Sequence, residues 1–299
     1  MCFFTALFGF TPKGVDESFK HYALYNACVL DIEYVKNKDP KMIDKKVPIK
    51  AVMKDHISII QAFGKQLLLL GVFMSIFSPM SYEPYDTDAN GNEAGFQCVH
   101  FLDFNLFLNN LVGAYYFQMV LTTFTTALQG LASVLYGVKT HGAMVNPIFE
   151  ATSASDFWGR RWNLIIHGAL KRGVFKPVYK MSSSKGCAVL ASFLASGMFH
   201  EYLLYHLHAH EANPSPVEIS YGKNTAFMMW NAAILVMESL FGGLYIFQWM
   251  KKRLPRQLVT FLVLSMALPV AHWFLHPYSK SDFFEHFLVG VPMIKEIHD

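Results

Sequence analysis

The chain has 299 residues, of which 53% are apolar and only 16% are charged. A soluble domain usually carries about 25% charged residues, so this composition disfavours a soluble protein. A formal net charge of +3 is too small to indicate nucleic-acid binding. The four cysteines lie far apart and form no C-x-x-C pair, so neither a disulfide framework nor a cysteine zinc site is expected.

The first ten residues are apolar but lack the basic start and the small-residue cleavage site of a signal peptide. They are too short to cross a bilayer, because a span takes about 20 apolar residues. We expect an interfacial segment here, or the remnant of a longer helix. The sequence shows no internal repeat, and we expect residues 1–299 to form a single membrane-embedded domain, with interfacial cytosolic segments 13–56 and 139–185.

Five apolar stretches are long enough to predict membrane spans: 57–79, 104–138, 186–208, 225–250 and 257–276. The longest has 35 residues without Asp, Glu, Lys or Arg, and the simplest prediction is one tilted helix that breaks near Gly130. Helices are expected because every backbone polar group in hydrocarbon must be paired within its segment. The runs do not alternate as barrel strands do. The sequence therefore predicts an all-α polytopic transmembrane helical bundle.

The charges between the predicted spans alternate in sign. Segment 13–56 holds nine lysines against seven acids, and segment 80–100 holds four acids and no base. Segment 139–185 is strongly basic, segment 209–224 is acidic, and segment 251–256 is basic again. Because Lys and Arg collect in cytosolic loops, this order predicts five crossings with the basic loops in the cytosol.

A histidine and a glutamate lie side by side deep in the span 186–208. His200 follows about 14 residues of predicted helix, so it is expected roughly 21 Å from the cytosolic end. Ionisable groups at such depth are costly and are functional candidates. The alternative is a histidine hydrogen-bonded between helices with Glu201 as its partner. Because neighbouring residues point about 100° apart on a helix, we expect a structural role for Glu201 rather than a triad with His200.

A second cluster lies in the basic segment 139–185, with two tryptophans and two arginines between Asp156 and Asn163: Trp158, Arg160, Arg161 and Trp162. Aromatic rings and guanidinium groups settle at membrane interfaces, which explains these four residues without any function. That explanation leaves Asp156 and Asn163 unaccounted for. With Lys171, Arg172 and Lys176 nearby, such a site also suits a phosphate-bearing substrate such as coenzyme A.

The strings Asp156-Phe-Trp-Gly-Arg-Arg-Trp-Asn163 and Ser196-Gly-Met-Phe-His200-Glu201 resemble the two signature motifs of the membrane-bound O-acyltransferase family. The resemblance is greatest to its wax synthase branch, the long-chain-alcohol O-fatty-acyltransferases. The order of the motifs and the spacing of 37 positions from Asn163 to His200 also resemble the family. The resemblance implies a bundle of about five to seven spans in the endoplasmic reticulum membrane.

The resemblance also implies the chemistry: acyl-CoA and a lipid alcohol as substrates in contact with membrane lipids, a wax ester as product, and neither cofactor nor metal. His200 would be the catalytic histidine and Asn163 its polar partner. A neutral imidazole can take the hydroxyl proton as the alcohol attacks the thioester, and an amide N–H can stabilise the developing oxyanion. The expected substrate-binding residues are Asp156, Trp158, Arg160, Arg161, Trp162, Lys171 and Arg172. Aromatic side chains of Phe199, Tyr202 and Tyr205 either line a tunnel or only pack.

Three alternatives remain open. The motifs do not choose among a long-chain alcohol, diacylglycerol, a sterol and a small alcohol as acceptor. The pairs His206/His210 and His272/His276 place two rings on one helix face, as in a di-iron enzyme, but the sequence has no H-x-x-H-H box. A transporter or scaffold would use Glu238 and His272 as relay residues, although the paired halves typical of transporters are not found.

Overall fold

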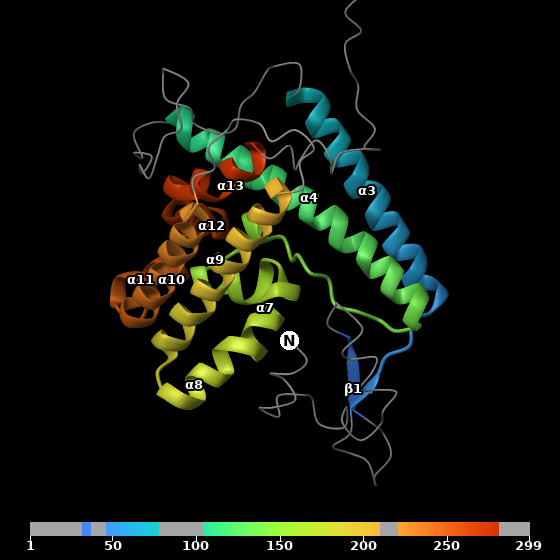
Figure 1. The fold of residues 1–299 in the computed structure, drawn as a ribbon, viewed down its shortest axis with the longest axis horizontal. Coiled ribbons are helices and arrows are strands. Elements are labelled where there is room, and N and C mark those ends of the chain that lie inside the picture. Colours follow the sequence, from blue (N-terminus) through green and yellow to red (C-terminus); the bar gives the residue numbers. More distant parts are fainter. Residues whose placement is uncertain (1–31, 37–45, 78–103, 210–220, 281–299) are drawn as a thin grey trace, which may run out of the picture.

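The computed structural model describes residues 32–36, 46–77, 104–209 and 221–280 (Figure 1). The predicted apolar start, the acidic segment 80–100 and His210 lie outside these ranges. The elements in chain order are β1 (Tyr34–Lys36), β2 (Lys46–Pro48), α3 (Met53–Phe77), α4 (Phe104–Tyr136), α5 (Pro147–Glu150), α6 (Ala154–Asp156), η2 (Phe157–Arg161), α7 (Leu164–Leu170), η3 (Lys171–Phe175), α8 (Lys176–Ser182), α9 (Lys185–Ala209), α10 (Lys223–Phe241), α11 (Tyr245–Arg253), α12 (Arg256–Ala267), η4 (Leu268–Val270) and α13 (Ala271–Lys280).

Four helical stretches in the described part of the chain are long and apolar enough to cross a bilayer: Met53–Ile76, Phe107–Tyr136, Lys185–His206 and Arg256–Tyr278. They coincide with four of the five predicted spans, so the prediction of an all-α polytopic membrane protein is confirmed. A small antiparallel sheet of β1 and β2, with Val35 opposite Val47, is an addition that the sequence did not predict.

The prediction of one continuous helix over 225–250 is wrong. Helix α10 ends at Phe241, two glycines follow, and α11 begins at Tyr245. Helix α10 is not among the candidate spans, since Lys223, Asn224, Asn231 and Glu238 interrupt its apolar sequence. The sidedness inferred from the loop charges assumed five crossings, and it stays a prediction.

Helices α3 and α4 form a long antiparallel pair beside the rest of the bundle (Figure 1). The Phe73 ring lies 5.7 Å from Tyr115 at one end of the pair. At the other end, a Cβ on Gly130 would lie 3.4 Å from Ile59. The predicted break near Gly130 is therefore wrong: α4 is continuous, and the glycine lies in van der Waals contact range of α3.

Helices α9 and α10 approach more closely than any side chain allows. A Cβ on Gly197 would lie only 2.7 Å from the Thr225 Cα, so this position requires glycine. One turn further along α9, Glu201 Oε1 accepts a hydrogen bond of 3.1 Å from the Thr225 N–H. A carboxylate is favoured at the N-terminus of a helix such as α10. The two contacts fix the position of His200, which lies between Gly197 and Glu201.

Candidate active site

The first motif folds as a short helix, a π-helical turn and a left-handed residue. Ser153 Oγ caps α6 by accepting the Asp156 N–H at 3.0 Å. The motif then continues as the π-helix η2 and ends at Asn163, the N-cap residue of α7. A second π-helix, η3, follows α7. Such turns are rare and occur frequently at functional sites.

One face of η2 is held by ion pairs. The Asp156 carboxylate is buried and accepts from Arg161 Nε at 2.7 Å and from the Thr152 N–H at 3.0 Å. Arg161 Nη1 also donates to Glu150 at 2.9 Å. Burial alone would raise the pKa of Asp156, but these hydrogen bonds outweigh burial and hold its pKa below the usual value. Arg160 is 75% exposed and makes a 3.3 Å ion pair with Asp156.

The other face of η2 is aromatic. Trp158 Nε1 donates to Asn231 Oδ1 on α10 at 3.1 Å. The Trp162 ring stacks between Phe157 at 5.3 Å and Phe117 of α4 at 6.3 Å. These contacts satisfy the partly buried indole N–H of Trp158 and fix both tryptophan rings against neighbouring helices.

Asn163 adopts a left-handed backbone conformation, with φ 39° and ψ 63°. Asparagine tolerates this conformation better than most residues that have a side chain. Its Oδ1 caps α7 by accepting the Ile166 N–H at 3.4 Å. Within the described residues its Nδ2 group donates no hydrogen bond, so the amide N–H remains for a ligand.

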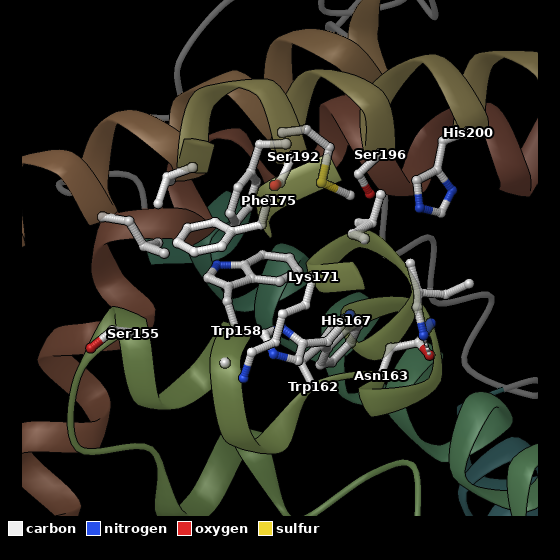
Figure 2. A pocket seen from close by; sticks show the side chains of 17 residues that line it. Ser155, Trp158, Trp162, Asn163, His167, Lys171, Phe175, Ser192, Ser196 and His200 are labelled. Carbon is white, nitrogen blue, oxygen red and sulfur yellow. Dashed lines mark hydrogen bonds between the residues drawn. The ribbon is translucent and has the colours of Figure 1, made fainter. Parts of the chain in front are cut away.

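His200 projects from α9 toward the space above Asn163 (Figure 2). Its Nδ1 lies 2.7 Å from the hydroxyl of Tyr278 on α13, and its ring makes a T-shaped contact with Phe274, with 4.8 Å between the ring centroids. Tyr278 is only 3% exposed. Nothing in the sequence indicates this contact, because the two partners lie 78 positions apart in the chain.

Two cavities meet at this histidine. The larger cavity, of about 260 Å³, lies among η2, α7, η3, α9 and α10. The smaller cavity, of about 120 Å³, lies among α4, η2, α10, α12 and α13. The two cavities share five lining residues: Trp158, Trp162, Asn163, His200 and Met228. A ligand in either cavity can therefore reach the same imidazole and the same amide.

The structure divides the predicted site residues. Catalytic candidates His200 and Asn163 line both cavities, as do Trp158 and Trp162, and Lys171 lines the larger cavity. The predicted substrate-binding residues that line neither cavity are Asp156, Arg160, Arg161 and Arg172. The rings of Phe199, Tyr202 and Tyr205 are exposed and also line neither cavity.

Four polar residues of the larger cavity were not predicted from the sequence: Ser155, His167, Ser192 and Ser196. Helical spacing could have indicated the last three. His167 follows Asn163 by four residues, while Ser196 and Ser192 precede His200 by four and eight residues, which places them on the same helix faces. Figure 2 shows the two serines in a row with His200 along α9.

The residues of the rival interpretations have other contacts. The Glu238 carboxylate accepts hydrogen bonds from the Ser155 N–H at 2.8 Å and from its hydroxyl at 2.7 Å. His272 Nδ1 lies 3.3 Å from Asn110 Nδ2. Within the described ranges, no group of three His, Cys, Asp or Glu residues is arranged to hold a metal ion.

Comparison with known proteins bears on the same motifs. Residues 142–220, which contain both motifs, match the sequence profile of the Membrane bound O-acyl transferase family. This part of the chain resembles that family. Two relatives come from Arabidopsis thaliana. Probable long-chain-alcohol O-fatty-acyltransferase 3 is 28% identical over 148 residues, and probable long-chain-alcohol O-fatty-acyltransferase 6 is 30% identical over 167 residues. The predicted resemblance to the wax synthase branch is thereby confirmed.

The matches to relatives are partial. They cover 47% and 54% of this chain, and 40% and 43% of the two relatives, so the chain spans less than half of the length of these acyltransferases. An acyl-CoA–sterol O-acyltransferase 1 from the same plant is 37% identical over 68 residues, which cover 21% of this chain and 20% of that protein.

Proposed function

We propose that this protein transfers a fatty acyl group from acyl-CoA to the hydroxyl of a long-chain alcohol and so forms a wax ester. The observation that carries the proposal is the meeting of two cavities at His200 and Asn163. Acyl transfer between two lipid substrates needs such a junction, because one base must reach the hydroxyl while one hydrogen-bond donor reaches the thioester.

The larger cavity suits the thioester end of acyl-CoA. Its wall contains Lys171 and His167 as well as His200. Lysine is a common phosphate-binding residue, and Lys171 is exposed at the start of η3. A coenzyme A head near Lys171 would direct the thioester along the cavity toward the imidazole.

The smaller cavity suits an alkyl chain. Apart from His200, Asn163 and the two tryptophans, its lining is apolar or aromatic, with residues such as Leu121, Leu264 and Phe274. Its volume of about 120 Å³ is below the roughly 300–1,000 Å³ of pockets that hold compact drug-sized ligands. A narrow methylene chain therefore fits better than fused rings, which favours a long-chain alcohol over a sterol.

The reaction follows from groups at the junction. His200 takes the hydroxyl proton as the alcohol oxygen bonds to the thioester carbon, and Asn163 Nδ2 donates to the carbonyl oxygen as it becomes negative. The carbon–sulfur bond then breaks, and the imidazolium returns its proton to the departing thiolate. The products are the ester and free coenzyme A. General-base catalysis typically contributes about 10²–10⁴-fold.

The proposal includes the setting of the reaction. The protein is an integral, multi-pass membrane protein, and we propose that it acts as one domain in the endoplasmic reticulum membrane. Segment 139–185, which carries eight basic residues, would face the cytosol, where acyl-CoA is available. The choice of organelle rests on the family resemblance.

The test uses membranes from a host that forms no wax esters, supplied with radiolabelled palmitoyl-CoA and hexadecanol. We expect wild-type membranes to form the ester and His200→Ala to reduce its formation by at least about 100-fold. His206→Ala is the matched control, because His206 lies on the same helix but is exposed and lines neither cavity. Ester formation at the normal rate by His200→Ala would overturn the general-base assignment.

The acceptor is tested separately. The same membranes receive hexadecanol, a diacylglycerol or a sterol at equal concentration. We expect the highest rate with hexadecanol. A preference for the sterol or the diacylglycerol, with loss of activity in His200→Ala, would overturn the wax-ester assignment and leave the role of His200 intact.

A further inference from the structure

Adjacent residues His200 and Glu201 point to different neighbours. His200 faces the cavities, whereas Glu201 turns to the N-terminus of α10 and accepts the Thr225 N–H. The two side chains therefore do not form a direct pair. Tyr278 from α13 places its hydroxyl 2.7 Å from His200 Nδ1, so this contact does not involve the other ring nitrogen, Nε2.

Tyr278 also interacts with Glu201. Glu201 is adjacent to His200 on α9, and its charge acts on the Tyr278 hydroxyl. Its Oε1 is occupied by the Thr225 N–H, while Oε2 is buried and has no hydrogen-bond partner among the described residues. A buried charged oxygen without a donor is costly, so the carboxylate favours an orientation in which the phenol proton points toward it.

We propose that Tyr278, oriented by Glu201, fixes the tautomer and the angle of the His200 ring. With its proton directed toward Glu201, the phenol oxygen accepts the Nδ1–H of His200. Nε2 then keeps its lone pair for the substrate hydroxyl. The opposite tautomer would carry its proton on Nε2 and could not act as a base there. Tyr278 and Glu201 are thus positioning residues, and this inference rests on the proposed function of His200.

The same contact supports the charged intermediate. When Nε2 takes the substrate proton, the His200 ring becomes positively charged. The hydrogen bond that its Nδ1–H donates to Tyr278 then becomes stronger, because a charged donor forms a stronger hydrogen bond than a neutral one. The other titratable side chains that share a cavity with His200 are His167 and Lys171. Neither of them is changed in the variants below, so their influence on the ring stays constant.

The main variant is Tyr278→Phe, which removes one oxygen and keeps the ring that packs 5.3 Å from Phe274. We expect kcat to fall about ten- to 100-fold, the usual worth of a hydrogen bond to a charged group, with KM for both substrates within twofold. The acid limb of the pH–rate profile should move to lower pH, because the protonated ring loses an acceptor. Tyr205→Phe, an exposed tyrosine on α9, is the control and should change neither quantity.

A second variant keeps the proposal testable if Tyr278→Phe does not fold. Glu201→Gln retains an oxygen for the Thr225 N–H but removes the charge that orients Tyr278. We expect a smaller fall in kcat than in Tyr278→Phe, with the acid limb moved in the same direction. Elution volume and thermal midpoint in detergent show whether each variant is folded. If Tyr278→Phe does not fold, the kinetics of Glu201→Gln test the positioning role instead.

A readout independent of acyl transfer separates this inference from the proposed function. Diethyl pyrocarbonate modifies neutral imidazole, and mass spectrometry can follow its reaction with His200 as a function of pH. The half-point of modification should lie at lower pH in both variants than in the wild type. An unchanged half-point and an unchanged kcat would overturn the role of Tyr278. If wild-type membranes form no ester with any acceptor, the proposed function fails, and the modification rates still decide whether Tyr278 controls the ring.

Discussion

The motif from Asp156 to Asn163 presents two faces that differ in chemistry and in contacts. Asp156 pairs with Arg161, which also pairs with Glu150, and neither Asp156 nor Arg161 lines a cavity, whereas Trp158 and Asn163 line both. The charged residues hold the π-helical turn in shape, and uncharged residues form the site. Charge within a motif is therefore a poor guide to substrate binding, because a buried carboxylate needs a partner whether or not a ligand is present.

The largest expected effect comes from the cavity face. Asn163→Asp keeps an oxygen to cap α7 and tolerates the left-handed backbone, but it removes the Nδ2 donor. We expect ester formation to fall about 100- to 1,000-fold, the usual cost of losing one oxyanion donor, with the thermal midpoint in detergent close to that of the wild type. Radiolabelled ester formation provides the measurement.

Asn163→Ala provides the complementary comparison. It removes both the donor and the capping oxygen, so it should lose activity and also lower the thermal midpoint, since a lost helix cap costs about 1 kcal/mol. Normal activity in Asn163→Asp together with low activity in Asn163→Ala would show that Asn163 acts only as a helix cap.

Substitutions on the ion-pair face should lower the stability of the fold rather than the rate of ester formation. Arg161→Gln leaves the buried Asp156 carboxylate without its 2.7 Å partner and should destabilise the fold by about 2–3 kcal/mol. Its neighbour Arg160 is 75% exposed, so Arg160→Gln should cost less than about 1 kcal/mol. Thermal unfolding in detergent compares the two variants. Equal losses of stability would contradict the division of the motif into two faces.

The smallest effect is expected at the mouth of the larger cavity. Lys171→Gln removes an exposed charge that we place near the phosphates of acyl-CoA, so KM for acyl-CoA should rise about two- to fivefold while kcat is unchanged. The effect should shrink at high salt, because exposed charges are screened. Lys180→Gln removes an equally basic, exposed side chain of α8 that lines neither cavity, and KM should stay at the wild-type value.

Run length predicted the spans better than it predicted their interruptions. The stretches 57–79 and 186–208 correspond closely to α3 and α9, because a long apolar run in hydrocarbon has few alternatives to a helix. For the run 225–250, length predicts one span, but Gly242 and Gly243 divide it into two helices. Average hydropathy hides such a break, since glycine is neither strongly polar nor charged.

The site was predictable where a motif carried it and unpredictable where the tertiary fold assembled it. His200 and Asn163 came from motif resemblance, and the structure brings both to the same junction. The ion pair of Arg161 with Asp156 could not be predicted from the sequence. The two residues are five positions apart, and a π-helical turn brings such residues together, whereas an α-helix separates them. Tyr278 could not be foreseen either, because its contact with His200 depends on how α13 packs against α9.

The contact of Gly197 with Thr225 has a consequence for substrate selection. Where two backbones touch without an intervening side chain, the helices cannot shift along each other without a clash, so His200, three residues further along α9, is held at a constant depth in the bundle. If the proposed function is correct, substrates of different length meet the imidazole at the same level. Their additional carbons must then be accommodated elsewhere in the cavities, and replacing a small lining residue such as Ala114 or Ala267 with a larger one should shorten the longest chain accepted.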